Sequence, residues 1–234
     1  MKALILAGGF GKRLRPLTEE KPKPLIEIKG KPIILWQIEW LKKYGIKEVI
    51  LAVGYKKEKF FEYLGSGKRF GIKIAYVVEE EPLGTAGAIK NAEHLLKNEK
   101  FFFVLNGDIL TNINLMKMLE IAEKTEYYGY IALVPMKSPY GIVELNDKNE
   151  IINFIEKPIL EHLLINAGIY LFRPEVFDYL PEKGDIEKQG FPELAKDKKL
   201  YGIVFRNYFW KSIDTIKDKE EVEKLDINNA LGLP

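Results

Sequence analysis

Two hydrophobic periodicities alternate along the first half of the chain, and this alternation restricts the fold more than any other feature. Buried strands are predicted over short apolar runs at residues 2–7, 48–53, 72–78 and 101–105. Between the first two runs, Ile34, Ile38 and Leu41 share one face of a predicted helix. Strands that alternate with helices favour a mostly parallel sheet with helices on both faces. In such α/β folds the ligand lies at the carboxyl ends of the strands, so the loops after the strands are the candidate functional segments.

The second half of the chain has strands with less helix between them. They are predicted over residues 130–135, 141–145, 151–155, 165–172 and 201–205. We therefore expect antiparallel strands that extend the sheet and wall one side of the site. Neither a flexible linker nor a repeat separates the two halves, so residues 1–234 are predicted to form a single domain, with a frayed tail beyond about residue 226.

The charge balance and the residue counts exclude several classes of protein. The 36 lysines and arginines face 34 aspartates and glutamates, a balance too even for a main partner such as nucleic acid or an anionic membrane. The chain has no cysteine, which excludes disulfides and thiol chemistry, and its two histidines argue against a histidine-rich metal centre. No apolar run reaches the ~20 residues that cross a bilayer. Because Gly11-Lys12-Arg13 stands where a signal peptide would have its cleavage site, we expect a cytoplasmic protein.

A glycine-rich loop follows the first predicted strand. Its sequence is Leu6-Ala7-Gly8-Gly9-Phe10-Gly11-Lys12-Arg13. Successive amides of such a loop can form an anion-binding nest. Positive charge is concentrated in and just after it, at Lys12, Arg13, Arg15, Lys21 and Lys23, and only Glu19 and Glu20 oppose it. The loop therefore predicts a polyphosphate site, in which arginine binds phosphate bidentately and lysine acts as a point charge.

Two common nucleotide-binding motifs do not fit this loop. A P-loop has Ser or Thr after its Gly-Lys pair and four residues between its glycines, whereas Arg13 follows Gly11-Lys12 and the glycines are closer together. A dinucleotide fingerprint has a third glycine where this chain has Leu14. Neither the P-loop nor the dinucleotide-binding class therefore accounts for the loop.

The pattern instead resembles the signature of the sugar-1-phosphate nucleotidylyltransferases. In this chain the signature consists of Leu6-Ala7-Gly8-Gly9, Arg13-Leu14-Arg15-Pro16-Leu17-Thr18 and Pro22-Lys23-Pro24-Leu25. The resemblance implies a Rossmann-like, three-layer α/β fold with a mostly parallel central sheet and antiparallel additions. It implies that Arg13 activates the departing pyrophosphate and that Lys23 neutralises charge at the reacting phosphates. It also implies that the triphosphate is held by Leu6, Ala7, Gly8, Gly9, Gly11, Lys12 and Arg13.

The segment after the third predicted strand resembles the nucleobase loop of the same family. Its sequence is Glu79-Glu80-Glu81-Pro82-Leu83-Gly84-Thr85-Ala86-Gly87. The resemblance implies that Glu79 faces the edge of the base and that Gly84 and Thr85 bind the nucleotide, with glycines that let a flat base approach. A carboxylate only accepts hydrogen bonds, so Glu79 suits guanine, whose N1-H and N2 amino groups are adjacent donors. We expect Glu80 and Glu81 to be simply solvated.

Two carboxylates are candidate magnesium ligands. Asp108 follows Asn106-Gly107 at the end of the fourth predicted strand, and by the resemblance it is a catalytic residue that binds Mg²⁺, a cation that takes oxygen ligands. Most family members have Trp-x-Asp-x-Gly-Thr near the end of the domain, but this chain has Trp210-Lys211-Ser212-Ile213-Asp214-Thr215. Residues two apart on a strand share a face, so Asp214 is predicted to replace the Asp expected at Ser212. A site with Asp108 alone is the alternative.

Further segments match the sugar side of the family. They are Tyr140-Gly141-Ile142-Val143, Glu156-Lys157-Pro158 and Asn166-Ala167-Gly168-Ile169-Tyr170. The resemblance implies that Glu156 accepts hydrogen bonds from sugar hydroxyls and that Lys157 meets the sugar phosphate. The full set implied for the sugar phosphate is Asn106, Gly107, Gly141, Glu156, Lys157, Asn166 and Gly168.

Together these motifs imply an enzyme that joins a nucleoside triphosphate to a sugar 1-phosphate and releases pyrophosphate. The loop at residues 79–87 and the Phe154-Ile155-Glu156-Lys157-Pro158 segment are most similar to mannose-1-phosphate guanylyltransferases, followed by heptose-1-phosphate guanylyltransferases. Many of the mannose enzymes carry a C-terminal β-helix of hexapeptide repeats, which this sequence does not show. Thymidylyl, uridylyl or cytidylyl transfer to glucose 1-phosphate stays open, as does a non-catalytic sensor of nucleotide sugars. Homo-oligomerisation also stays open.

Overall fold

The computed structural model describes residues 1–233 and is built on one seven-stranded sheet with strand order β12-β8-β11-β6-β1-β4-β5. These strands are β1 (Lys2–Leu6), β4 (Glu48–Val53), β5 (Lys73–Val78), β6 (Phe102–Asn106), β8 (Gly129–Lys137), β11 (Ile159–Phe172) and β12 (Leu200–Val204). All neighbours pair in parallel except β11, which is antiparallel to both β6 and β8. The predicted mostly parallel sheet with antiparallel additions is therefore confirmed.

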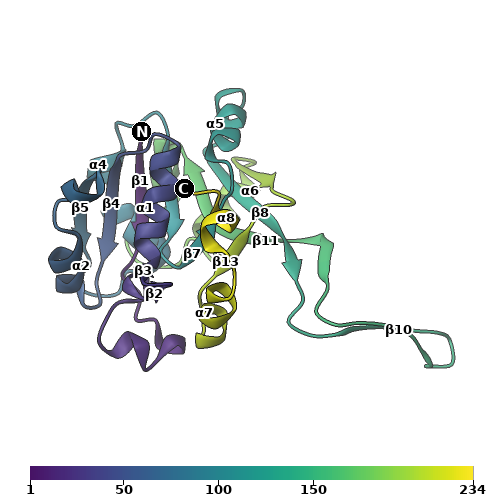
Figure 1. The fold of residues 1–234 in the computed structure, drawn as a ribbon. Helices are drawn as coiled ribbons and strands as arrows, with labels where there is room; N and C mark the ends of the chain where they lie inside the picture. The colour runs from purple at the N-terminus through teal and green to yellow at the C-terminus, as the bar shows by residue number, and fades with distance from the viewer. Residues whose placement is uncertain (234) are drawn as a thin grey trace.

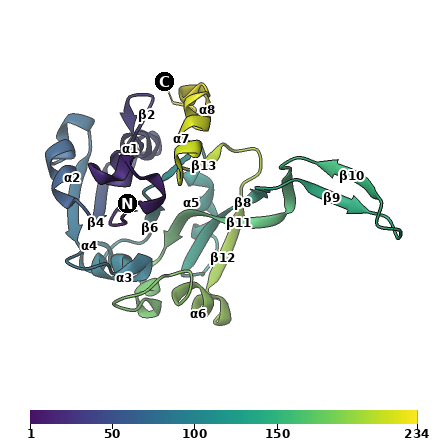
Figure 2. The same ribbon diagram turned by 90° about the horizontal axis from the view of Figure 1, so that it is seen from below.

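Helices cover both faces of this sheet (Figures 1 and 2). They are α1 (Ile33–Lys43), α2 (Lys57–Leu64), α3 (Gly84–Asn91), α4 (Glu93–Leu96), α5 (Leu115–Glu123), α6 (Gly190–Lys196), α7 (Ile216–Glu223) and α8 (Ile227–Leu231). Alternate residues of β1 enter two separate cores: Ala3 and Ile5 pack with α1, α2 and α5, whereas Leu4 packs with α3, α4 and α6. A strand buried on both faces explains why 2–7 is a continuous apolar run without alternation.

Short strands and 3₁₀ turns connect the main elements. The strands are β2 (Glu27–Ile28), β3 (Lys31–Pro32), β7 (Ile109–Thr111) and β13 (Trp210–Ser212). The 3₁₀ turns are η1 (Lys12–Leu14), η2 (Leu17–Glu19), η3 (Lys23–Leu25), η4 (Lys68–Phe70) and η5 (Pro174–Tyr179). Three of these turns, η1, η2 and η3, fall in the basic segment between β1 and α1, so that segment is folded onto the sheet edge.

Residues 227–233 pack against the rest of the molecule through α8. Ile227 and Leu231 of α8 are buried in a third apolar core with Ile28 and Ile33. Asn112 also donates a 2.9 Å hydrogen bond to the carbonyl oxygen of Ala230. The partners of these residues lie near the start of the chain, so the local sequence could not show that the tail has a surface to pack against.

A long β-hairpin departs from the rest of the molecule. Strands β9 (Ile142–Leu145) and β10 (Ile151–Ile155) pair only with each other and project beyond the ends of β8 and β11 (Figures 1 and 2). The strands themselves were predicted correctly, but this pair does not wall the site as expected. Strand β11 instead lies antiparallel to β6, next to the carboxyl end of that strand.

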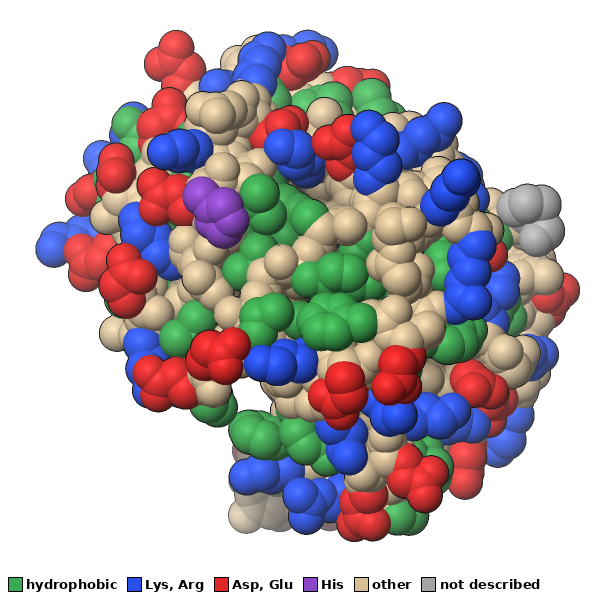
Figure 3. All heavy atoms as spheres, turned by 90° about the vertical axis from the view of Figure 1, so that its left-hand side faces the viewer, with side chains coloured by type: hydrophobic (Ala, Val, Ile, Leu, Met, Phe, Trp, Pro, Cys, Tyr) green, Lys and Arg blue, Asp and Glu red, His purple; other side chains and the backbone are tan. Residues whose placement is uncertain are grey.

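The surface charges are mixed, as the even composition predicts. Figure 3 shows acidic and basic side chains interspersed over the face that lies on the left of Figure 1, without a large area of one sign. Within residues 1–233, no helix combines the length and the apolar character that a bilayer crossing demands. Any concentration of positive charge for an anionic ligand is therefore local.

Candidate active site

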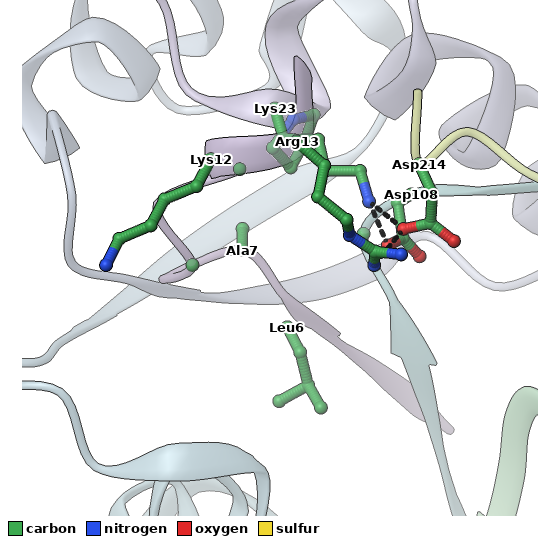
Figure 4. A pocket seen from close by; sticks show the side chains of 11 residues that line it. Leu6, Ala7, Lys12, Arg13, Lys23, Asp108 and Asp214 are labelled. Atoms are coloured by element: carbon green, nitrogen blue, oxygen red, sulfur yellow. Dashed lines mark hydrogen bonds and ion pairs between the residues drawn. The ribbon is translucent and has the colours of Figure 1, made fainter. Parts of the chain in front are cut away.

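A cavity of about 280 Å³ opens at the carboxyl ends of β1 and β6 (Figure 4). Its lining comes from the glycine loop, the basic segment, the turn after β6 and the segment after β13. These residues are Leu6, Ala7, Gly9, Gly11, Lys12, Arg13, Lys23, Pro24, Gly107, Asp108 and Asp214. The predicted triphosphate loop and the predicted metal ligands therefore share one cavity.

The glycine loop is shaped by Gly11. This residue has a φ of 60° in the left-handed region, and a Cβ there would stand 2.8 Å from the side chain of Thr18. Thr18, itself buried, donates a 3.0 Å hydrogen bond to the carbonyl oxygen of Gly11. This contact folds the basic segment back on the loop, and Figure 4 shows the Arg13 side chain directed toward Asp214 and that of Lys12 directed away from it.

Asp108 is positioned by the tight turn between β6 and β7. The Gly107 amide donates to the carbonyl oxygen of Leu6, and a Cβ on Gly107 would lie 2.6 Å from that oxygen. Gln37 of α1 is buried, with 3% of its surface exposed. Its side-chain amide donates hydrogen bonds of 2.8 Å to the carbonyl oxygen of Asn106 and 3.0 Å to that of Ile109. These contacts fix the backbone on both sides of Asp108.

The sequence interpretation did not identify Gln37 as a residue of the site. The signal was present, because Gln37 is a polar residue within an otherwise apolar stretch of α1. A buried polar side chain in such a position needs hydrogen-bond partners. In this chain those partners are the backbone carbonyls of Asn106 and Ile109, on either side of Asp108.

Asp214 reaches the cavity through pairing of β13 with β7. The two strands are antiparallel, and the Ile213 amide donates a 2.9 Å hydrogen bond to the carbonyl oxygen of Asp108. Asp214 follows directly, just before Thr215, which caps α7 together with Asp218. The two carboxylates are thus brought together by backbone pairing between segments about a hundred residues apart.

Lys23 lies between the two carboxylates (Figure 4). Its Nζ atom donates hydrogen bonds of 2.5 Å to Asp108 Oδ2 and 2.8 Å to Asp214 Oδ1. Arg13 Nη2 lies 2.7 Å from the same oxygen of Asp214, and Ser212 Oγ donates to its other oxygen at 2.9 Å. Partial burial opposes ionisation of Asp214, but Lys23, Ser212 and Arg13 outweigh it and hold its pKa below the usual value.

The chemistry of Asp108 and Asp214 fits a magnesium ion. Both carboxylates contact one ammonium nitrogen, so their oxygens converge on a common position that suits a compact cation. Magnesium keeps several waters and uses one or two carboxylates together with substrate phosphates. Within residues 1–233, no three or more acidic, histidine or cysteine side chains are grouped so that they could hold a metal ion by themselves. A magnesium site that also uses substrate phosphates does not need such a group.

Glu79 lies beside the glycine loop, at the end of β5. A Cβ on Gly8 would stand 2.5 Å from Glu79 Oε1, and the Leu83 amide donates a 3.2 Å hydrogen bond to Oε2. Burial raises the pKa of Glu79 despite this hydrogen bond. The two following residues, Glu80 and Glu81, are exposed and pair with Lys57 and Lys183, in agreement with their prediction as solvated residues.

Gly84 and Gly87 of the predicted base loop pack closely against the backbone of residues 182–184. A Cβ on Gly84 would lie 2.4 Å from the carbonyl oxygen of Gly184, and one on Gly87 would lie 2.6 Å from that of Glu182. The direction in which a side chain would extend at these two positions is thus occupied by the 182–184 backbone. Thr85 is also engaged there, since its hydroxyl donates 2.7 Å to Glu187 Oε2 and accepts from the Ile186 amide.

Asn166 and Gly168 stand on β11 beside Asn106. Gly168 has a φ of 67°, and a Cβ there would lie 2.7 Å from Asn106 Nδ2. Asn166 donates 2.8 Å to the hydroxyl of Tyr170 and accepts from the Gly168 amide. Burial raises the pKa of Tyr170, so its phenol stays neutral. Among residues 1–233, the buried Oδ1 atom of Asn106 has no hydrogen-bond partner.

Of the residues predicted to bind the sugar phosphate, Gly107 lines the cavity, and the other six are not among its lining residues. Gly141, Glu156 and Lys157 belong to the base of the projecting hairpin, and Lys157 Nζ pairs with Glu156 Oε1 at 3.1 Å. Both side chains of this pair are exposed. The structure therefore brings together Arg13, Lys23, Asp108 and Asp214, but not the Glu156-Lys157 pair with them.

Comparison with known proteins agrees with this arrangement. Residues 2–229 match the family model described as nucleotidyl transferase. The mannose-1-phosphate guanylyltransferase catalytic subunit beta of Dictyostelium discoideum is 43% identical over 224 residues, and the mannose-1-phosphate guanyltransferase of Saccharomyces cerevisiae is 40% identical over 227. Each alignment covers 93% of this chain and 62% of the relative, so the chain spans less than two thirds of the length of these relatives.

Solved structures share the fold. HddC from Yersinia pseudotuberculosis is 27% identical with a TM-score of 0.75, over 95% of this chain and 98% of that one. The same protein complexed with GMP-PN gives a TM-score of 0.74. Since the family model extends over nearly all of the sequence and the cavity unites its signature residues, the chain belongs to the nucleotidyl transferase family.

Proposed function

We propose that this chain transfers a nucleotidyl group from a nucleoside triphosphate to a sugar 1-phosphate and releases pyrophosphate. The observation that carries the proposal is the contact of Lys23 with both Asp108 and Asp214 below a loop of glycines and basic side chains. This arrangement combines a cradle for phosphates with a pair of oxygen ligands for a divalent cation. A phosphoryl-transfer site needs both, because its catalysis depends on positioning and charge stabilisation.

The reaction we propose needs no general base. An oxygen of the sugar phosphate, already ionised near neutral pH, forms a bond to the α-phosphorus while the bond to the departing pyrophosphate breaks. Lys12 and Arg13 are positioned to bind the leaving phosphates, and Lys23 can turn its hydrogen bonds from the carboxylates to a phosphate oxygen. Asp108 and Asp214 would hold magnesium, which would offset phosphate charge when bound.

We propose guanine as the base and mannose 1-phosphate as the preferred sugar phosphate. Glu79 stands beside the glycine loop with acceptor oxygens that suit the donors of guanine. The relatives from Dictyostelium and yeast are named for mannose 1-phosphate and guanylyl transfer, and HddC is described with GMP-PN. Heptose 1-phosphate is the second candidate.

Pyrophosphate release with a panel of triphosphates and sugar phosphates tests this proposal. We expect turnover with GTP and mannose 1-phosphate in the presence of Mg²⁺, and loss of turnover when the ion is chelated. Asp108→Ala is expected to abolish the reaction, whereas Asp178→Ala, an exposed aspartate on η5, serves as the matched control. Binding of nucleotide sugars without turnover of any pair would instead favour the non-catalytic sensor.

A further inference from the structure

Asp214 lies beyond the last paired residue of β13. That strand ends at Ser212, which pairs with the first residue of β7. The hydrogen bond from the Ile213 amide to the carbonyl oxygen of Asp108 extends this pairing by one residue. A carboxylate at position 212, where the family pattern has it, would stand on the strand itself. The carboxylate at position 214 needs support from a different part of the chain.

The side chain of Asp218, in the first turn of α7, supplies this support. Its Oδ2 atom accepts hydrogen bonds of 3.2 Å from the Asp214 amide, 2.8 Å from the Thr215 amide and 2.7 Å from the Thr215 hydroxyl. The Thr215 hydroxyl in turn accepts a 3.2 Å hydrogen bond from the Asp218 amide, which completes a capping box. A capping box holds the amide of the cap residue. In this chain the same carboxylate also holds the amide of the residue before the cap.

Lys211 holds the other oxygen of Asp218. Its Nζ atom lies 2.6 Å from Asp218 Oδ1 and 2.9 Å from Glu221 Oε2. The side chains of Lys211 and Asp218 are only 27% and 22% exposed, so solvent screens this ion pair less than it screens a pair on the open surface. Because Lys211 belongs to β13, the pair joins the first turn of α7 to the strand that precedes Asp214.

Apolar packing and one hydroxyl complete the junction between β13 and α7. Ile213 is fully buried and Val222 of α7 is 1% exposed, and both belong to the third apolar core. This packing fixes α7 relative to the strand. Ser212 Oγ donates a 2.9 Å hydrogen bond to Asp214 Oδ2. Asp218 therefore holds the backbone of Asp214, and Ser212 orients its carboxylate.

We propose that Asp218 is a positioning residue that keeps Asp214 at the metal site, with Ser212 as its assistant. This inference rests on the proposed function, because Asp214 is an ion ligand only in that proposal. Asp218 is not among the residues that line the cavity, so it acts through Asp214 and not on a substrate. The capping box of α7 thus explains how a carboxylate two residues later than the family pattern can serve the same ion.

The magnesium dependence of turnover tests this role. For Asp218→Ala we expect the Mg²⁺ concentration at half-maximal rate to rise about tenfold, an effect typical of a residue that supports a metal ligand. The kcat at saturating ion should stay close to that of wild type, because Asp214 is still present. Asp218→Asn keeps one acceptor oxygen for the two amides and should show a smaller rise. A lower kcat with an unchanged half-maximal concentration overturns the positioning role.

A double variant separates positioning from a general loss of stability. Residues that act through one another have non-additive effects. In the Asp214→Asn background, Asp218→Ala should therefore cause no further rise in the Mg²⁺ concentration that is needed. A rise that simply adds to that of Asp214→Asn would show that Asp218 acts independently of Asp214, and it would overturn the proposal.

Asp226→Ala is the matched control. Asp226 caps α8 by accepting a hydrogen bond from the Asn229 amide, so its replacement removes a helix cap of the same kind at another helix. We expect its magnesium dependence to equal that of wild type. Binding of Mn²⁺, which takes the same oxygen ligands, gives the same comparison without turnover, through the spectrum of the free ion in electron paramagnetic resonance. Equal Mn²⁺ affinity of wild type and Asp218→Ala overturns the proposal.

Hydrogen exchange tests the support of Asp214 without ion or substrate. The amides of Asp214 and Thr215 donate to Asp218, so both should exchange faster in Asp218→Ala than in wild type when followed by NMR. Asp226→Ala should leave both rates unchanged. Unchanged rates in Asp218→Ala overturn the inference even if turnover is altered. Faster exchange, in a chain whose wild type neither binds Mn²⁺ nor turns over any substrate pair, would confirm the support of Asp214 and refute the proposed function.

Discussion

Lys23 donates a 2.8 Å hydrogen bond to Asp214, a residue 191 positions later in the chain. The same ammonium contacts Asp108, so one lysine occupies the position on which both carboxylates converge. Replacement of Lys23 should therefore expose two negative charges to each other. It should also remove a positive charge from the phosphate site.

For Lys23→Ala we expect turnover to fall roughly 100-fold, a loss typical of one charge-stabilising donor in a preorganised site. Lys97→Ala, which removes an exposed lysine far from the cavity, provides the control. Steady-state pyrophosphate release measures both variants. Equal rates for the two would remove Lys23 from the reaction.

Asp214→Asn is expected to weaken the magnesium dependence of turnover, with about a tenfold higher ion concentration needed for half-maximal rate. It also changes the dependence of stability on pH. The wild-type pKa of Asp214 is lowered, so its ionised form stabilises the fold above the usual value of 3.8, and this contribution is lost as the pH falls through the lowered value. Urea unfolding between about pH 7 and pH 3 should show a larger loss for wild type than for Asp214→Asn. Parallel pH profiles would contradict this account.

Glu79→Gln is expected to change the choice of base. An amide presents a donor as well as an acceptor, so GTP turnover should fall by about tenfold and the preference should move toward a pyrimidine triphosphate. Burial raises the pKa of Glu79, so the ionised side chain costs stability at neutral pH. The variant should therefore be more stable than wild type at pH 7. The difference should vanish as the pH falls below the usual carboxyl value. Unchanged ratios of kcat/KM for the triphosphates would show that Glu79 does not contact the base.

Gln37→Met should separate the support of the site from its chemistry. The variant leaves the carbonyl oxygens of Asn106 and Ile109 without this donor in a buried region, which should cost about 1–3 kcal/mol of unfolding free energy. Turnover should fall as well, because the Asp108 turn loosens. Asp108→Ala gives the contrast, since it should abolish turnover with little loss of stability. Denaturant midpoints and rates measured on the same samples distinguish the two patterns.

Leu231→Ala tests whether the C-terminal helix belongs to the folded core. Leu231 is 1% exposed among residues of the third apolar core, so truncation should cost roughly 2–4 kcal/mol. Leu225→Ala, at an exposed position just before α8, should have little effect. Thermal unfolding of both variants measures the difference. A stability of Leu231→Ala equal to that of wild type would mean that the tail contributes nothing to the core.

Part of the site was predictable because its determinants are local. The Gly8-Gly9-Phe10-Gly11 loop directly after an apolar strand, and the basic residues that follow it, can be recognised from spacing and residue type alone. Asp214 was also predicted, although Ser212 holds the position expected for the metal ligand. The structure adds the reason for its placement, because pairing of β13 with β7 places the following residue beside Asp108.

Other features were beyond prediction because they depend on partners far along the chain. Gly84 and Gly87 are required by the 182–184 backbone, a segment that no local pattern connects with them. Gln37 supports a turn some seventy residues later. The root of the β9–β10 hairpin is closed by a hydrogen bond from the Ser138 amide to the carbonyl oxygen of Pro158, which the strand propensity of residues 141–155 does not encode.

The sequence by itself determined the layered α/β class, and it predicted the glycine loop, the concentration of basic residues and the two carboxylates that the structure brings into one cavity. These properties follow from periodicity and side-chain chemistry, which act over a few residues. Only the tertiary structure decided that Lys23 lies between Asp108 and Asp214, that α8 packs against the N-terminal region, and that Glu156 and Lys157 stand apart at the base of the β9–β10 hairpin. Such contacts depend on strand order and register. Hydrogen bonding across a sheet joins segments that are far apart in the sequence, and the residue pattern of one segment does not reveal which other segment it will pair with.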